Sequence, residues 1–130
     1  MKKRIFALAL AMALALTVPA VAAQDSADNF VRSRTYTGQF PDLTADSTFY
    51  DNVTALYEYG LTAGRADGTF GLRDSLTVGQ VVIFAGRIRS LYRTGDAEAG
   101  NRAYGGDGGP VALGYLRYLQ AEGVIGTELD

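Results

Sequence analysis

Apolar residues recur at helical spacing from residue 49 onward. Phe49, Val53, Leu56 and Tyr57 fall at i, i+4, i+7 and i+8, which places them on one face of a helix. Gly60 predicts the end of that helix, because glycine adopts the left-handed backbone conformation without a Cβ clash. We therefore predict a short amphipathic helix between about residues 49 and 59.

A second, longer helix is predicted to begin at Ser75 or Thr77, either of which can cap it, and to end near Gly95. We expect its apolar stripe to face the core. The stripe comprises Val78, Val81, Val82, Ala85, Ile88, Leu91 and Tyr92. The opposite, polar face carries Gln80, Arg87, Ser90 and Arg93.

A third helix is predicted from about Pro110 to Glu122, because proline suits a first helical turn. Leu116 and Leu119 mark its apolar face, and Gly123 predicts its end. Between the second and third helices, residues 95–109 contain six glycines, which is typical of a linker.

The first and third helices share a pattern when the chain is shifted by 63 residues. The shift aligns apolar residues and a terminal glycine: Val53 with Leu116, Leu56 with Leu119, Gly60 with Gly123, and Leu61 with Val124. We interpret this as an internal repeat, with one complete unit and one partial unit. Stacked helical repeats bury their apolar faces against one another.

The first 23 residues have the pattern of a secretory signal peptide. A cationic start at Lys2, Lys3 and Arg4 precedes an apolar run of 12 residues, and Ala20–Ala23 follows as a small-residue cleavage site. The predicted organisation is therefore a signal peptide at 1–23, a polar leader at 24–39, a first unit at 40–94, the linker at 95–109 and a partial second unit at 110–130.

Composition excludes several functions. The chain has no Cys and no His, which excludes disulfides, thiol catalysis and catalytic triads based on imidazole. Removal of the signal peptide leaves nine arginines against 14 acids, so nucleic acid is not an expected partner. The acids are spread singly along the chain, unlike the paired carboxylates of a glycosidase or the ligand set of a metal site. We therefore expect no enzyme activity, metal or cofactor.

Residues 40–93 resemble an S-layer homology domain in the order and spacing of their motifs. Phe40-Pro41-Asp42 matches the opening F-x-D, the glycines of Gly60-Leu61-Thr62-Ala63-Gly64 match the spacing of G-I-x-x-G, and Asp67-Gly68-Thr69-Phe70 matches D-G-T-F. Thr77 holds the first position of the family's T-R-A-E. The resemblance implies an all-α fold of short helix–loop–helix repeats, here one divergent repeat and a partial second one.

The resemblance also implies a secreted module, at the cell wall or cell surface, that binds secondary cell-wall polysaccharide without a covalent bond. In the family, the arginine of T-R-A-E is a main contact to an acidic sugar, which fits the bidentate binding of carboxylate by guanidinium. In this chain Val78 takes that place and offers no hydrogen-bond donor. The glycan-binding candidates are Tyr50, Asp67, Thr77, Gln80 and Arg87, and the structural turn residues are Gly60, Gly64 and Gly68.

Alternative interpretations remain for these residues and for the chain. Turn geometry alone explains Asp67, and Arg87, Arg89 and Arg93 form either a solvated helix face or a patch for anionic glycan. The chain is alternatively a protein–protein or self-assembly module, with another S-layer homology-like module or a second copy as partner, or a fragment of a longer protein of the family. We expect no membrane contact after signal cleavage, and we expect Phe70 and Leu72 to pack inward.

Overall fold

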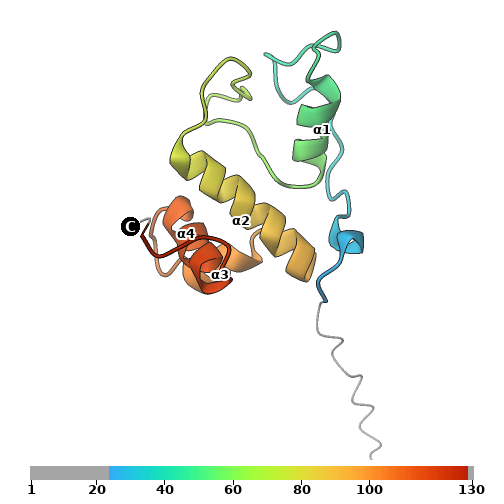
Figure 1. Ribbon diagram of the computed structural model, residues 1–130. Coiled ribbons are helices and arrows are strands. Elements are labelled where there is room, and N and C mark those ends of the chain that lie inside the picture. The colour runs from blue at the N-terminus through green and yellow to red at the C-terminus, as the bar shows by residue number, and fades with distance from the viewer. Residues whose placement is uncertain (1–23, 129–130) are drawn as a thin grey trace, which may run out of the picture.

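The computed structural model describes residues 24–128, and the predicted signal peptide lies outside them. The described chain is helical and contains no strand, which confirms the all-α prediction. Its elements are the 3₁₀ helix η1 (Ala27–Asn29), α1 (Tyr50–Glu58), α2 (Val78–Thr94), α3 (Ala99–Tyr104) and α4 (Val111–Ala121) (Figure 1). Within residues 24–128, no helix combines the length and apolar character needed to cross a bilayer.

Helix α1 ends, as predicted, just before Gly60, whose φ is +73°. The N–H of Leu61 donates to the carbonyl of Leu56 at 2.8 Å, and the N–H of Gly60 donates to that of Tyr57 at 3.0 Å. This is the hydrogen-bond pattern of a Schellman motif, and it turns Leu61 into the core. The helix starts later than expected, and Phe49 is exposed, which corrects its place on the apolar face.

The loop between α1 and α2, residues 62–76, is called here the turn loop. It brings Phe70 and Leu72 against a first core cluster of Phe40, Leu43 and Val53. The ring centroids of Phe40 and Phe70 lie 5.7 Å apart. The predicted inward packing of Phe70 and Leu72 is therefore confirmed, and it anchors the loop on the segment that precedes α1.

Helix α2 begins and ends at the predicted residues. Thr77 caps it, and Gly95 follows its last turn with a φ of +75°. The predicted orientation of its apolar stripe is wrong, however. Leu91 is the one fully buried member, while four of the others are exposed, namely Val78, Val81, Ile88 and Tyr92.

The buried side of α2 consists instead of small residues that accommodate large rings of α4. Gly86 lies against Tyr115, and the fully buried Ser90 lies next to Gly100 of α3. The Ser90 hydroxyl accepts a hydrogen bond from the Gly100 N–H at 3.0 Å. Periodicity of apolar residues missed this face, because its apolar surface is supplied by the partner helices.

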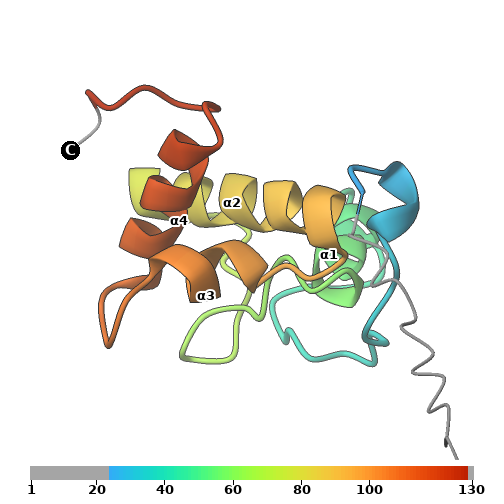
Figure 2. The ribbon, with the colours of Figure 1, turned by 90° about the horizontal axis from the view of Figure 1, so that it is seen from below.

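The segment predicted as a glycine-rich linker contains α3. Gly100 lies so close to Tyr118 of α4 that a Cβ atom there would come within 2.4 Å of the ring. Figure 1 shows α3 and α4 on one side of α2 and α1 on the other. In Figure 2, α4 crosses the N-terminal half of α2.

The polar leader connects the C-terminal ends of α1 and α2, whose backbones do not approach each other closely. The N–H of Ser33 donates to the carbonyl of Glu58 at 2.8 Å, and the N–H of Ser26 donates to that of Tyr92 at 3.0 Å. Phe30 packs on a second core cluster, which contains Leu61 and Leu91. The leader is thus an integral part of the fold.

Helix α4 ends with the same hydrogen bonds as α1, at the positions that the 63-residue shift aligns. The N–H of Val124 donates to the carbonyl of Leu119 at 2.9 Å, and Gly123 has a φ of +67°. Val124 is exposed, however, whereas Leu61 is buried. The two helix ends therefore repeat in geometry but differ in what covers them.

Candidate functional site

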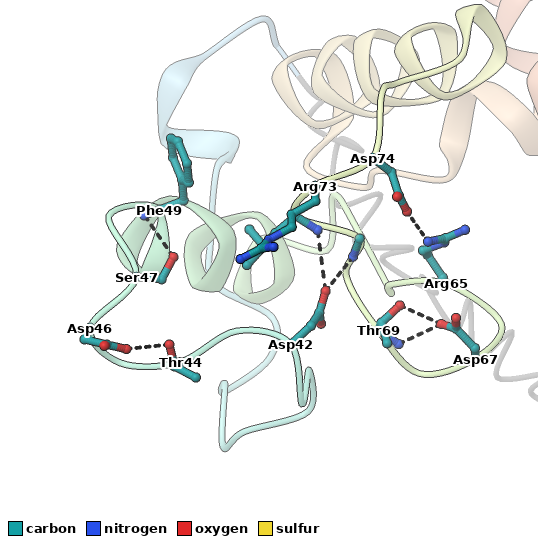
Figure 3. Close-up of a pocket in the computed structure, with 12 residues that line it drawn as sticks. Asp42, Thr44, Asp46, Ser47, Phe49, Arg65, Asp67, Thr69, Arg73 and Asp74 are labelled. Atoms are coloured by element: carbon teal, nitrogen blue, oxygen red, sulfur yellow. Dashed lines mark hydrogen bonds and ion pairs between the residues drawn. The ribbon is translucent and has the colours of Figure 1, made fainter.

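Asp42 joins the two motifs that carry the family resemblance. Its carboxylate accepts hydrogen bonds from the backbone N–H groups of Phe70 at 2.9 Å, Gly71 at 2.8 Å and Leu72 at 3.5 Å (Figure 3). The bond from Phe70 is the main cause that lowers the pKa of Asp42 below its ordinary value. These hydrogen bonds thus link the F-x-D motif directly to the end of the D-G-T-F motif. Sequence reasoning assigned Asp42 to the motif but gave it no role.

Asp67 shapes the tip of the turn loop. Its carboxylate accepts from the Thr69 hydroxyl at 2.7 Å and from the Thr69 N–H at 3.0 Å. The hydroxyl bond is the main cause that lowers the pKa of Asp67. Gly60, Gly64 and Gly68 all have positive φ, between 73° and 84°, as their predicted role as turn residues requires.

A polar hollow of about 640 Å³ separates the turn loop from the start of α1 (Figure 3). Among its lining residues, Phe49 has 57% of its surface exposed. Arg73 makes no ion pair within residues 24–128, whereas Arg65 pairs with Asp74. The hollow is lined by Asp42, Thr44, Asp46, Ser47, Phe49, Arg65, Asp67, Thr69, Gly71, Leu72, Arg73 and Asp74.

The chemistry of the polar hollow is that of hydrogen bonding around an aromatic surface. Hydroxyls, carboxylates and a guanidinium line the hollow together with the exposed Phe49, whose ring extends away from Thr44 and Asp46 in Figure 3. In the described part of the chain, no cluster of three or more His, Cys, Asp or Glu side chains is arranged to hold a metal ion. Sequence reasoning placed Phe49 on the apolar face of a helix and gave Arg73 no role, although both lie close in sequence to the F-x-D and D-G-T-F motifs.

A second hollow, the apolar groove, lies between the turn loop and α2 and has a volume of about 800 Å³. Three predicted glycan-binding residues, Thr77, Gln80 and Arg87, line it. Most of the remaining wall is apolar and includes Phe70 and Leu76.

Thr77 and Gln80 bond to each other across the first turn of α2. The N–H of Thr77 donates to the Gln80 side-chain oxygen at 2.8 Å, and the N–H of Gln80 donates to the Thr77 hydroxyl at 3.2 Å. This reciprocal arrangement is a capping box. Both side chains therefore stabilise the start of the helix.

Arg87 is half-buried and already has two partners. Its Nε donates to the Glu98 carboxylate at 2.8 Å, and its Nη1 donates to the Leu61 carbonyl at 3.0 Å. Arg89 and Arg93 both pair with Glu122 at the end of α4. The arginines of α2 therefore connect it to neighbouring segments.

Tyr50 lies apart from the other four predicted glycan-binding residues. Its ring meets that of Tyr36 edge-on, with the centroids 5.9 Å apart, beside the first core cluster. It lines neither the polar hollow nor the apolar groove. The five candidates are thus divided among three places, and Asp67 is the one that lines the polar hollow.

Comparison with protein families gives one match, to the S-layer homology domain, over residues 39–71. This segment covers about a quarter of the chain and contains Asp42 and the Phe70 and Gly71 amides that bond to it. No curated protein and no solved structure matches the chain. S-layer homology domains are cell-surface attachment modules, and the match confirms the resemblance of this segment to them that the order of its motifs predicts.

Proposed function

We propose that this protein is a secreted, non-catalytic module that attaches to the cell envelope by binding wall polysaccharide in the polar hollow. The observation that carries the proposal is the combination of an exposed Phe49 ring with an Arg73 guanidinium that no carboxylate of residues 24–128 engages. The similarity of residues 39–71 to a family of cell-surface modules supports it.

The lining of the hollow suits a sugar. An aromatic ring offers an apolar face on which the C–H groups of a sugar ring pack. A guanidinium binds a carboxylate or another anionic substituent through two parallel hydrogen bonds. Figure 3 shows the Arg73 side chain extending from the turn loop toward the side of the hollow that carries Phe49. Hydroxyls of Thr44, Ser47 and Thr69 also line the hollow and offer acceptor oxygens, although those of Thr44 and Thr69 already donate to Asp46 and Asp67.

The predicted glycan-binding residues have defined parts in this proposal. Asp67 lines the hollow and contributes a carboxylate acceptor at its edge. Thr77 and Gln80 act indirectly by capping the start of α2, and Arg87 acts indirectly by joining α2 to Glu98 and Leu61. Tyr50 supports the aromatic cluster under α1.

Co-sedimentation with purified cell-wall sacculi tests the proposal. The chain that begins at Gln24 should pellet with the walls, and free wall polysaccharide should compete for it. Phe49→Ala and Arg73→Gln should each reduce the pelleted fraction several-fold. Arg117→Gln is the matched control, because Arg117 is exposed on α4 and makes no ion pair within residues 24–128. Recovery of a folded sample entirely in the supernatant would refute attachment to the wall.

A further inference from the structure

Five residues on one face of α2 form a stripe without charge. Val78, Val81, Ala85, Ile88 and Tyr92 follow one another at intervals of three, four, three and four residues. This alternation is the spacing of the seam along which two helices pack together. In this stripe, called here the α2 seam, the exposed fractions are 77% at Val78, 50% at Val81, 44% at Ile88 and 36% at Tyr92, and Ala85 is half-buried.

None of the other described helices covers the α2 seam. Helices α3 and α4 pack on a different side of α2, against Gly86 and Ser90. The charged side chains of α2 are also directed elsewhere, since Arg87 pairs with Glu98 and Arg89 pairs with Glu122. A partner on the seam would therefore bury apolar surface without leaving a charge unpaired.

We propose that the α2 seam binds the α2 seam of a second copy of this chain, in antiparallel orientation about a two-fold axis at Ala85. Ala85 lies seven residues from either end of the seam. The antiparallel pairing therefore places Val78 beside Tyr92 of the second copy and Val81 beside Ile88. The small side chain of Ala85 allows the two helices to approach closely where they cross. The seam is thus complementary to itself, as an interface with two-fold symmetry requires.

Electrostatics favours the antiparallel orientation, and the available area fits a weak dimer. Antiparallel helices oppose their macrodipoles, whereas parallel helices align them. The exposed side chains of the seam, with Leu76 beside them, offer roughly 450 Å² per copy, about half of the area in a standard protein interface. The wall of the apolar groove continues the same surface, because Val81, Ala85 and Ile88 line both. The expected dimer is weak and reversible, and none of the seam residues lines the polar hollow.

Sedimentation equilibrium of the chain that begins at Gln24 tests the dimer. We expect a reversible monomer–dimer equilibrium over a roughly hundredfold range of concentration, as mass action requires. Val81→Glu and Ile88→Glu should each weaken dimerisation about tenfold or more, because they bury a carboxylate in the contact. Val31→Glu is the control, since Val31 is an exposed valine of the leader. An unchanged urea midpoint shows that each variant still folds.

Disulfide trapping tests the orientation, since the native chain has no cysteine. Mild oxidation should link two copies of Ala85→Cys, whose Cβ atoms face each other across the axis. Val78→Cys should stay unlinked, because its two copies would lie about 20 Å apart along antiparallel helices. A chain that remains monomeric, a dimer indifferent to Val81→Glu, or faster linking of Val78→Cys than of Ala85→Cys would overturn the proposal. Wall co-sedimentation is measured separately and does not depend on these outcomes.

Discussion

Gly86 of α2 lies directly against Tyr115 of α4. A Cβ atom at Gly86 would come within 2.3 Å of the ring Cδ1 and 2.7 Å of the Tyr115 Cβ. Tyr115 is fully buried, and its hydroxyl donates to the Ala97 carbonyl at 2.8 Å. The ring is therefore held at both ends, and the two helices approach closely at this point because α2 has no side chain there.

Gly86→Ala should destabilise the protein, although alanine is intrinsically better than glycine in a helix by about 1 kcal/mol. The added methyl group would overlap the stem of a fixed ring, and overpacking of this kind costs about 1–3 kcal/mol beyond the propensity gain. Urea unfolding measures the free energy of unfolding. The matched control is Gly79→Ala on the same helix, whose Cβ would meet Ala112 at an ordinary 3.5 Å. That variant should be neutral or slightly more stable, and an equal effect of both substitutions would contradict the close contact.

Asp42→Ala should release the turn loop. Three backbone N–H groups donate to Asp42 and would lose their acceptor. Hydrogen bonds to a charged group in a partly solvated loop contribute about 1–2 kcal/mol in total to the free energy of unfolding. Hydrogen exchange should accelerate at Phe70 and Gly71. Asp107→Ala, in the glycine-rich segment before α4, is the control and should leave these amides unchanged. Equal protection in both variants would show that Asp42 does not hold the loop.

The hydrogen bonds between Asp42 and the turn loop should weaken in acid. Because hydrogen bonds lower the pKa of Asp42 below 3.8, the carboxylate contributes stability that is fully present above that value and is lost as the pH falls through the lowered pKa. Near-ultraviolet circular dichroism of the aromatic cluster, recorded from pH 5 downward, should report the loss. Asp46, Asp67, Asp96 and Glu122 also have lowered pKa values, so the comparison with Asp42→Asn isolates this residue. A difference between the two proteins that does not vary with pH would contradict the assignment.

Local rules predicted the helix boundaries. Thr77 and Gln80 form a capping box, and Gly60, Gly95 and Gly123 take left-handed conformations at helix ends, because these features depend on a few neighbouring residues. The inner face of α2 could not be predicted in this way. Its partners Tyr115 and Tyr118 are distant in sequence, and small residues such as Gly86 carry no periodic signal of burial.

The candidate site also combines features that neighbouring residues determine with features that depend on distant segments. The motifs located the turn loop and Asp67, because these features depend on a few neighbouring residues, but they gave no role to Asp42, which lies 28 residues before Phe70. Whether a side chain is free to bind depends on contacts from other segments. Arg87 was a reasonable candidate by residue type, but Glu98 and Leu61 engage it. Arg73 drew no attention in the sequence, yet at the polar hollow it is the guanidinium that no carboxylate of the described residues 24–128 engages.

Asn29→Ala should destabilise the protein through the leader. The Asn29 amide donates to the Tyr92 carbonyl at 2.7 Å, at the C-terminal end of α2, and to the Gln24 carbonyl at 2.8 Å. Loss of these bonds should lower the free energy of unfolding by about 1 kcal/mol and speed exchange of the Ser26 amide, which donates to the same Tyr92 carbonyl.

Asn52→Ala is the matched control for the leader, because Asn52 is exposed on α1 and its amide makes no hydrogen bond within the described residues. Alanine is also the better helix former, so that variant should be as stable as the native chain or slightly more so. Equal stability of the two alanine variants would mean that the Asn29 hydrogen bonds contribute nothing to the stability of the fold. A loss of stability confined to Asn29→Ala would show that the leader stabilises the C-terminal end of α2, next to the core cluster of Leu61 and Leu91.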